Sequence, residues 1–390
     1  MQILYIASAA FDEPLIKSQV LSYLFHNALH GRVQYSLVTF ERRAIDKDVQ
    51  NSIVADLKSK GINWIPIWIS SKNRFMGMFQ DIRHATNILR DHLQTNPHDL
   101  IHARSFLPGN TAARLKKKLG IPMLYDMRGF WAKEKYAYGR LKFLPAKWVA
   151  QFMENRVFDA ADHLISLTES GVHFLKEQGS TKPITCIPCC VDLNKFRPLL
   201  NKPTNDQHQL VSVGSLGRGY RCDAVFQFAA EYQKLHKNTQ LLLLTRTDRN
   251  FILDIANHSG FPLDRVTIES VSHEEVPVRV AAATAGICMI ESSDAKIASC
   301  PTKLGEYLAC GLPAIANVPI GDVEDTLTKR NVGIPVRLDH DPMAHAAAKL
   351  IKLVNDPNIK SRAREEAVGR FNLVDGANAY VDVYQSMINK

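Results

Sequence analysis

Short apolar runs alternate with longer amphipathic segments along almost the whole chain. Uninterrupted apolar runs of this kind are typical of parallel strands that are buried on both faces. Seven of them occur in the first half: Ile3–Ala7, Tyr35–Phe40, Trp64–Ile69, Leu100–His102, Met123–Tyr125, Leu164–Leu167 and Ile184–Pro188. Segments with helical spacing of apolar residues lie between them, for example Leu15–Leu29, Gln80–Gln94 and Thr111–Leu119.

A second series of strands and helices follows a polar, turn-rich stretch. We interpret that stretch, residues 194–209, as a linker because Pro198, Pro203 and several Asn residues interrupt any regular element. Six further strands are predicted after it: Leu210–Val213, Gln240–Leu244, Val266–Ile268, Gly286–Ile290, Ala314–Asn317 and Gly333–Pro335. The last amphipathic segment, Asp375–Met387, predicts a terminal helix.

The sequence therefore predicts an α/β protein of two Rossmann-like, doubly wound parallel-sheet domains that face a cleft. We expect an N-terminal domain at residues 1–193 and a C-terminal domain at residues 210–374. A helix at residues 375–390 is expected to pack back toward the N-terminal domain. Ligands of open α/β sheets bind at the carboxyl ends of the strands, so each domain offers a candidate site there.

The composition agrees with a folded protein of more than one domain. A chain of 390 residues exceeds the usual size of one domain, and 46% hydrophobic residues exclude general disorder. The first residues lack the features of a signal peptide, and no apolar run is long enough to span a membrane, so we expect a cytoplasmic protein. The seven Cys are expected to be reduced core thiols, because no second ligand cluster completes a metal site near Cys186, Cys189 and Cys190.

Positive charge is concentrated in the first half of the chain. Residues 1–199 contain 27 Lys and Arg against 17 Asp and Glu, whereas residues 200–390 contain 21 against 22. Such asymmetry suggests an anionic partner. Lys116–Lys118 and the basic, aromatic stretch Arg140–Val149 are typical of surfaces that lie on anionic lipid headgroups. We expect peripheral contact with the inner face of the plasma membrane and no binding of nucleic acid; the alternative is an ordinary basic face.

The loop after Leu210–Val213 is rich in glycine but lacks the spacing of a dinucleotide fingerprint. Gly214, Gly217 and Gly219 do not fit G-x-G-x-x-G, and no Walker A sequence occurs in the chain. NAD-dependent dehydrogenases and P-loop NTPases are therefore disfavoured.

The most informative segment is Ser299–Pro313, which predicts a short helix with Pro301 in its first turn, followed by a buried strand. The N-terminus of such a helix suits a phosphate. Thr302, Lys303 and Glu306 can address one side of it, where a carboxylate can accept both hydroxyls of a ribose. A surface helix with a Lys–Glu pair explains the spacing equally well, so both interpretations stay open at this point.

Five segments together resemble the family-4 retaining glycosyltransferases, which have the GT-B fold. Ser299–Pro313 resembles the hallmark of that family. The other four, in chain order, are Tyr125–Trp131, Ile187–Pro198, Val213–Gly217 and His273–Pro277. The first of these four resembles the acceptor-side loop of bacterial members that build surface polysaccharides. The ordered set spans nearly the whole chain.

The sequence departs from the family pattern in several segments, including the first-domain loop Asp12–Leu15, which lacks the common glycines. Ala298 stands where a Glu commonly precedes Glu306 by eight residues, and Cys189-Cys190 replaces Asn-Gly. Asp126–Gly129 stands where the family has a catalytic-loop His. Because the missing Glu contacts the donor sugar in the family, the identity of that sugar stays open.

The resemblance implies a retaining enzyme that moves a sugar from a nucleotide sugar, a UDP- or GDP-sugar, to a glycan, lipid-linked or other hydroxyl acceptor in cell-envelope polysaccharide synthesis. It implies no metal and no further cofactor. A nucleotide-sugar epimerase of the same architecture is the alternative enzyme. A non-enzymatic basic protein that binds membrane or nucleic acid is the alternative outside enzymes.

The resemblance also implies a donor site in the C-terminal domain. A diphosphate leaving group needs cationic donors, because negative charge grows on it as the glycosidic bond breaks. Arg218 and Arg221 both fit this role, and either can instead be a solvated arginine. Arg221 is assigned a catalytic role, and the predicted donor-binding residues are Gly214, Ser215, Arg218, Arg246, Pro301, Thr302, Lys303 and Glu306.

An acceptor site is predicted at the carboxyl ends of the fourth and fifth strands of the N-terminal domain. Asp126 is predicted to order or deprotonate an acceptor hydroxyl, and Arg128 to hold an anionic acceptor. The alternative is a loop salt bridge between the two. Arg104, Ser105 and Glu134 are predicted to share this acceptor side.

Overall fold

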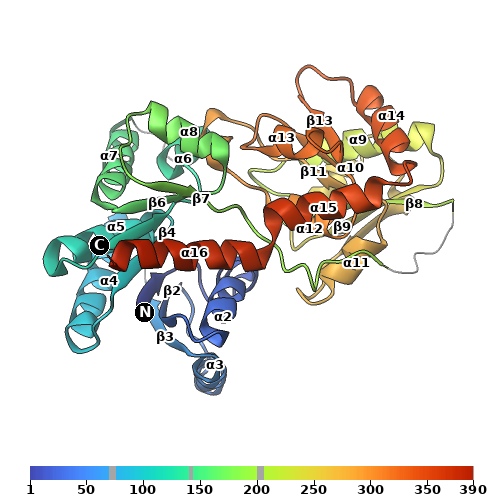
Figure 1. The fold of residues 1–390 in the computed structure, drawn as a ribbon. Coiled ribbons are helices and arrows are strands. Elements are labelled where there is room, and N and C mark those ends of the chain that lie inside the picture. The colour runs from blue at the N-terminus through green and yellow to red at the C-terminus, as the bar shows by residue number, and fades with distance from the viewer. Residues whose placement is uncertain (70–75, 140–143, 200–205, 390) are drawn as a thin grey trace. The chain divides into compact units, whose positions relative to one another are not determined.

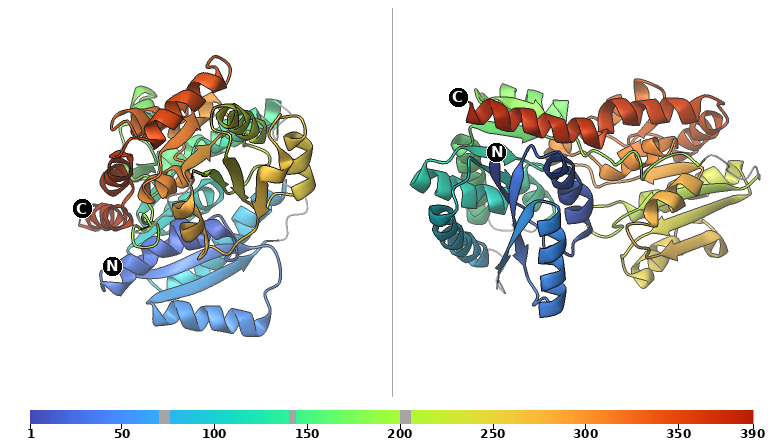
Figure 2. Two further views of the ribbon diagram at one scale, coloured as in Figure 1. Left: turned by 90° about the vertical axis from the view of Figure 1, so that its right-hand side faces the viewer. Right: turned by 60° about the horizontal axis from the view of Figure 1, so that its bottom comes forward.

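The computed structural model describes residues 1–69, 76–139, 144–199 and 206–389. They form two compact units, Met1–Pro188 with Leu373–Lys390, and Cys189–Asn372. Each unit contains one parallel sheet with helices around it (Figure 1, Figure 2). The predicted α/β class and the two Rossmann-like sheets are confirmed, and each predicted strand corresponds to a strand in the described residues.

The first unit is built on a seven-stranded sheet. Its elements are β1 (Gln2–Ile6), α1 (Pro14–Ile16), η1 (Lys17–Leu21), α2 (Ser22–Leu29), β2 (Gln34–Glu41), α3 (Lys47–Ser59), β3 (Ile62–Trp68), α4 (Met76–Thr95), β4 (Leu100–Arg104), α5 (Phe106–Leu119), β5 (Met123–Asp126), α6 (Trp131–Ala137), α7 (Leu144–Ala160), β6 (His163–Ser166), α8 (Glu169–Glu177), β7 (Ile184–Cys186) and α16 (Leu373–Ile388). The strand order is β3-β2-β1-β4-β5-β6-β7. This order reverses between β1 and β4, and doubly wound sheets bind their ligands at such a switch point.

The second unit is built on a six-stranded sheet. Its elements are β8 (His208–Val213), α9 (Cys222–Leu235), β9 (Thr239–Leu244), α10 (Arg249–Ala256), η2 (Leu263–Arg265), β10 (Val266–Glu269), α11 (Val276–Ala282), β11 (Ala285–Cys288), η3 (Asp294–Ala298), α12 (Thr302–Ala309), β12 (Ala314–Asn317), α13 (Val323–Thr328), β13 (Gly333–Val336), α14 (Met343–Val354) and α15 (Ile359–Phe371). The order β10-β9-β8-β11-β12-β13 places its switch point between β8 and β11.

Burial explains why the central strands are almost entirely apolar. All five positions of β4 and all four positions of β11 are buried, as expected for parallel strands covered on both faces. Two of the polar exceptions stand at carboxyl ends, Arg104 in β4 and Asp126 in β5. These two candidate polar residues therefore lie at the edge of the sheet where the apolar core ends.

The boundary between the units differs from the predicted linker at residues 194–209. Phe196 lies in the core of the second unit, and the guanidinium of Arg364 donates to the carbonyl oxygens of Leu193 and Phe196 at 2.8 and 2.6 Å. These contacts tie residues 189–199 to the second unit, and β8 begins inside the predicted linker. Residues 200–205 lie outside the described residues.

The terminal helix α16 is part of the first unit, although 184 residues separate it from the rest of that unit. Asn27 of α2 donates to the carbonyl oxygen of Ala377 at 3.2 Å, and Arg32 donates to Asn378 at 2.7 Å. Figure 1 shows α16 running along this unit close to α2. In the described part of the chain, no helix is both long and apolar enough to cross a membrane.

Candidate functional site

The glycine-rich loop after β8 stands at the switch point of the second unit. Gly214 and Gly219 have φ values of +93° and +90°, a backbone region that other residues rarely adopt. The amide of Leu216 donates to Oγ1 of Thr247 at 3.0 Å, and Tyr220 pairs with Ile290 in an antiparallel bridge. The loop is therefore held at both ends, while Gly214 and Ser215 are exposed.

Tyr307 positions α12 against this loop. Its hydroxyl accepts a hydrogen bond from the amide of Val213 at 3.0 Å and donates to the carbonyl oxygen of Ile287 at 3.2 Å. The ring lies so close to β11 that a Cβ on Gly286 would stand 2.2 Å from it, so only glycine fits there. One buried side chain thus joins α12 to β8 and β11, the two strands of the switch point.

Lys303 of α12 lies against the loop, and its charge acts on Glu306 of the same helix. A Cβ on Gly214 would stand 3.8 Å from Nζ of Lys303, and that ammonium lies 4.7 Å from the centre of the Tyr220 ring. Both charged residues are only 9% exposed. Burial lowers the pKa of Lys303 and raises the pKa of Glu306 to about 7, although the charge of Lys303 opposes the second shift. The structure therefore brings three predicted donor residues together.

The three predicted arginines of this unit differ in their partners. Arg221 makes a bidentate ion pair with Asp223, with contacts of 2.9 and 2.8 Å, and this hydrogen bonding raises its pKa. Its charge is therefore already compensated. Arg218 and Arg246 are exposed, and no hydrogen bond or ion pair holds the Arg218 side chain among the described residues. Pro301 and Thr302 are half-buried at the start of α12.

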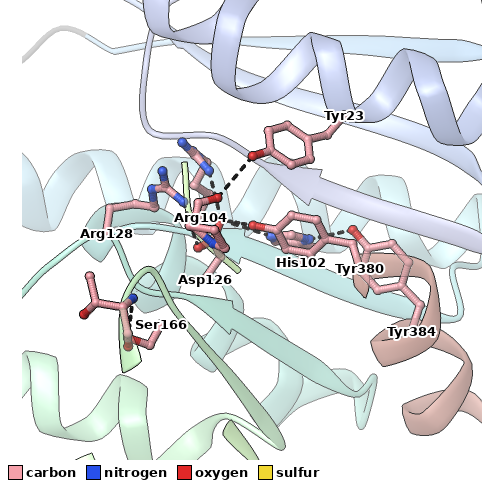
Figure 3. A network of polar contacts seen from close by, with 10 residues as sticks. Tyr23, His102, Arg104, Asp126, Arg128, Ser166, Tyr380 and Tyr384 are labelled. Carbon is pink, nitrogen blue, oxygen red and sulfur yellow. Dashed lines mark hydrogen bonds and ion pairs between the residues drawn. The ribbon is translucent and has the colours of Figure 1, made fainter. Parts of the chain in front are cut away.

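A buried carboxylate organises the predicted acceptor side in the first unit. Oδ2 of Asp126 accepts hydrogen bonds from Arg104 at 3.0 Å and from the hydroxyl of Tyr380 at 3.2 Å. Oδ1 accepts from Arg128 at 3.4 Å, and Nε2 of His102 lies 3.6 Å from Oδ2. Figure 3 shows Asp126 between Arg128 on one side and His102 and Tyr380 on the other.

The electrostatics of this cluster correct one prediction. Burial by itself would raise the pKa of Asp126, but the positive charges of Arg128 and Arg104 outweigh it and hold that pKa well below its usual range. A carboxylate that is fully buried in two ion pairs is a weak base. Asp126 is therefore unsuited to deprotonate an acceptor hydroxyl, and the ion pair with Arg128 that we weighed as the alternative is present.

Ser105 and Glu134 occupy different places on this side of the unit. Ser105 directly follows β4, has a φ of +79°, and donates its amide to the carbonyl oxygen of Asp126 at 2.9 Å. Glu134 lies in α6, where its charge acts on Glu154 of α7. Burial raises the pKa of Glu154 to about 7. The structure therefore joins Ser105 to the cluster and places Glu134 on α6, near Glu154.

Two tyrosines of α16 complete the cluster and were missed in the sequence. Tyr380 reaches Asp126, and the hydroxyl of Tyr384 lies 2.7 Å from Nδ1 of His102. Burial lowers the pKa of His102, so the imidazole is neutral at pH 7. These tyrosines stand 254 and 282 positions from their partners, and no local sequence signal could have indicated the contact.

The structure offers no group of three or more His, Cys, Asp or Glu side chains placed to hold a metal ion within the described residues. All seven Cys are free thiols, and five of them are buried.

Comparison with known proteins identifies a domain in the first half of the chain. Residues 27–190 match the family model described as "Glycosyl transferase 4-like domain". Residues 27–190 therefore form a glycosyl transferase 4-like domain, which agrees with the resemblance drawn from the motifs. A search of the curated proteins found no match.

Solved structures establish the fold over the full length. Sucrose-phosphate synthase from Thermosynechococcus elongatus is 19% identical, with a TM-score of 0.78 over 100% of this chain and 99% of that one. HepE from Anabaena, in complex with UDP and glucose, is 14% identical, with a TM-score of 0.70 over 99% and 100%. The lipopolysaccharide outer core galactosyltransferase WaaB is 14% identical, with a TM-score of 0.68 over 98% and 99%. A putative UDP-N-acetylglucosamine 2-epimerase from Listeria monocytogenes also shares the fold, with a TM-score of 0.65. The chain has the GT-B fold.

Replacing Asp126 by Asn should destabilise the protein by about 3–5 kcal/mol, because it removes the buried charge that pairs with Arg104 and Arg128. Replacing Asp223 by Asn removes an ion pair at a partly exposed site and should cost about 0–1 kcal/mol. Urea denaturation of both variants measures the difference. Because the pKa of Asp126 is depressed in the folded state, its contribution should be present above about pH 3.9 and fade at lower pH. An equal decrease in the free energy of unfolding of the two variants would contradict the central role of Asp126.

Proposed function

We propose that the chain is a retaining glycosyltransferase that uses a UDP- or GDP-sugar as donor and a glycan or lipid-linked hydroxyl as acceptor. In this proposal the second unit binds the donor and the first unit binds the acceptor. The observation that carries it is the position of Lys303 beside Gly214 at the switch point of the second unit, with buried Glu306 within reach of the charge of Lys303. Solved complexes of the similarly folded HepE with UDP and UDP-glucose support a nucleotide sugar as ligand.

Each donor residue has a distinct proposed role. Glu306 accepts hydrogen bonds from the two ribose hydroxyls, as only an ionised carboxylate can do at both oxygens. The diphosphate lies against the loop at Gly214 and Ser215 and the first turn of α12, where free amides and the helix dipole favour anions. Lys303 and Arg218 supply the positive charge that offsets the charge developing on the leaving diphosphate. These groups are the chain's own, so no step is assigned to a metal.

We propose that the acceptor proton passes to the leaving diphosphate as the new bond forms on the same face of the sugar. The state of Asp126 supports this assignment, because its low pKa and two ion pairs make it a poor general base. Asp126 then acts by positioning Arg104 and Arg128. Arg221, earlier assigned a catalytic role, is better suited to holding the start of α9 through Asp223.

A nucleotide-sugar epimerase has the same fold and the same need for a donor site. It differs in needing no second substrate, so incubation with a UDP-sugar alone separates the two activities. A non-enzymatic binder predicts that no nucleotide sugar binds at all.

Replacing Glu306 by Gln should weaken binding of UDP-glucose or a GDP-sugar by about 10- to 100-fold, because a charge-assisted hydrogen bond is lost. In the wild type, affinity should rise as the pH rises through about 7, since Glu306 ionises there, and Glu306→Gln should show no such rise. Calorimetric titration with the nucleotide sugar measures both effects. The free nucleotide is unsuitable as probe because its terminal phosphate titrates near pH 6. Glu365→Gln, on the exposed side of α15, is the matched control. Unchanged binding by Glu306→Gln would refute the ribose assignment.

Arg218→Ala should lower kcat by about 10- to 100-fold, whereas Arg221→Ala should change it little, because Asp223 already neutralises Arg221. Initial-rate measurement at saturating donor distinguishes the variants. The opposite ranking, or equally small effects, would remove this loop from the proposed mechanism.

We further propose a role in cell-envelope polysaccharide synthesis, with peripheral contact to an anionic membrane through the first unit. The name of WaaB, a lipopolysaccharide galactosyltransferase of the same fold, is in line with this role. Trp148 and Phe152 stand one turn apart in α7 and are 74% and 63% exposed. Lys147 and Arg156 flank them, which pairs apolar rings with the positive charge that anionic headgroups attract.

Only part of the predicted basic surface is exposed in the structure. Lys116 is engaged by Asp162 at 2.5 Å and by the carbonyl oxygen of Ala160 at 2.8 Å, so only Lys117 and Lys118 of that run are exposed. Residues 140–143 of the predicted stretch lie outside the described residues.

Replacing Trp148 and Phe152 together by Ala should weaken cosedimentation with vesicles that contain anionic lipid. The remaining binding should fall at high salt, where screening shortens the reach of charges to about 3 Å at 1 M. Phe251→Ala, an exposed phenylalanine of the second unit, is the matched control and should bind like the wild type. Vesicle binding that is equal in all three proteins would rule out this surface.

A further inference from the structure

We propose that Glu41 and Phe11 form a binding site for an uncharged sugar ring of the acceptor, at the carboxyl ends of β1 and β2 in the first unit. This inference rests on the proposed function, which assigns the acceptor to that unit, and it adds the chemical class of the group that binds. Neither residue belongs to the acceptor side predicted from the sequence.

Glu41 is a buried carboxylate with one oxygen left unused. It is the last residue of β2 and is only 3% exposed. Oε1 accepts from the hydroxyl of Thr39 at 2.6 Å and from the amide of Phe11 at 3.1 Å. Within the described residues, Oε2 accepts no hydrogen bond and joins no ion pair. Because an ionised carboxylate accepts at both oxygens, Oε2 is a free acceptor for a ligand hydroxyl.

Burial makes this unused oxygen significant. Burial raises the pKa of Glu41, the bonds from Thr39 and Phe11 oppose that shift, and the charges of Asp12 and Glu13 add to it. A carboxylate that is withdrawn from water is costly unless its oxygens are hydrogen-bonded. A hydroxyl that donates to Oε2 would reduce this cost, so Glu41 is better satisfied with a ligand than without one.

Phe11 supplies an apolar surface beside this carboxylate. It is half-buried in the loop between β1 and α1, and its ring centre lies 5.0 Å from that of Trp64. Nε1 of Trp64 donates to the hydroxyl of Thr39 at 2.9 Å, and Thr39 in turn donates to Glu41. Ligand sites combine apolar and aromatic walls with a few fixed polar groups. Since a sugar ring has both C–H faces and hydroxyl groups, Phe11 and Glu41 together suit such a ring.

The loop after β1 is fixed along the end of β2. The amide of Phe40 donates to the carbonyl oxygen of Ala9 at 3.4 Å, and the amide of Phe11 donates to Glu41. β1 is a strand of the switch point, where ligands of doubly wound sheets bind. The fold therefore sets the positions of Phe11 and Glu41 before any ligand binds.

The charges around the site favour an uncharged ring. Asp12 and Glu13 are exposed in the same loop, and neither makes an ion pair in the part of the chain that the structure describes. Together with Glu41 they place three carboxylates at this edge of the sheet. An acidic sugar would be repelled there, whereas the hydroxyl groups of a neutral sugar can donate to a carboxylate.

The test uses the full chain and ligand-observed NMR titration with the methyl glycosides of glucose, galactose and mannose as probes. At least one glycoside should bind the wild type, and the matching uronic acid glycoside should bind more weakly. Glu41→Gln should weaken binding of the effective glycoside by about 10- to 100-fold, because a charge-assisted hydrogen bond is lost. Phe11→Ala should weaken it by about 10-fold, and Phe11→Tyr, which keeps the ring, should retain it.

Asp12→Asn and Leu15→Ala are the matched controls. The first removes an exposed carboxylate from the same loop, and the second removes an apolar side chain that is 56% exposed in α1. Both should bind the glycoside like the wild type. A loss in Asp12→Asn as large as that in Glu41→Gln would overturn the specific role of the buried carboxylate.

The melting temperature distinguishes ligand binding from a purely structural role. Gln at position 41 keeps an oxygen that accepts from Thr39 and Phe11 and removes a buried charge, so the melting temperature of Glu41→Gln should not fall. Weaker binding at an unchanged melting temperature is the expected result. Weaker binding together with a lower melting temperature would assign Glu41 to holding the loop alone. That result, undiminished binding in Glu41→Gln and Phe11→Ala, or no glycoside binding by the wild type would overturn the proposal.

Nucleotide-sugar binding separates this inference from the proposed function. Glu41→Gln should bind UDP-glucose or a GDP-sugar like the wild type, since Glu41 lies in the first unit and the proposed donor site in the second. If the nucleotide sugar binds and no methyl glycoside does, the sugar site is refuted while the donor site stands. If no nucleotide sugar binds, the donor site fails, and the glycoside titration still decides the sugar site.

Discussion

The first unit depends on one buried carboxylate. Asp126 holds the ends of β4 and β5 together through Arg104, and it ties the last helix of the chain to that sheet through Tyr380. A buried carboxylate is costly to place in a protein interior, and it is tolerated here because each oxygen accepts from a cationic or hydroxyl donor. The bonds that compensate the charge of Asp126 also hold Arg104 and Arg128 in place. The contacts that stabilise the buried carboxylate therefore set the geometry of the candidate acceptor site.

In the second unit, a neutral hydroxyl group instead of a carboxylate joins neighbouring strands to a helix. The hydroxyl of Tyr307 bonds to the ends of β8 and β11, and the missing side chain at Gly286 lets its ring lie against the sheet. Lys303 and Glu306 follow from that placement, since they share the helix with Tyr307. Because the anchor is uncharged, the charged residues of α12 remain available to a ligand, in contrast to Asp126.

Arginines that have similar positions in the sequence differ in whether a carboxylate neutralises them. Arg218 and Arg221 lie three positions apart in one loop, yet Asp223 neutralises only Arg221. In the first unit Asp126 forms ion pairs with both Arg104 and Arg128. The acidic partners of an arginine therefore distinguish residues that a count of basic residues treats alike.

The sequence by itself determined the strands, their parallel arrangement in two sheets, and the placement of Gly214 and Glu306 near one switch point. Apolar runs and helical spacing are local signals, and the carboxyl ends of strands are the known places for ligands in such sheets. Only the tertiary structure decided that Phe196 belongs to the second unit, that Arg221 is neutralised, and that Asp126 is too strongly paired to act as a base. It also brought Tyr380 and Tyr384 to residues more than 250 positions away. Burial and charge compensation depend on neighbours that are distant in the chain, and a sequence pattern carries no record of them.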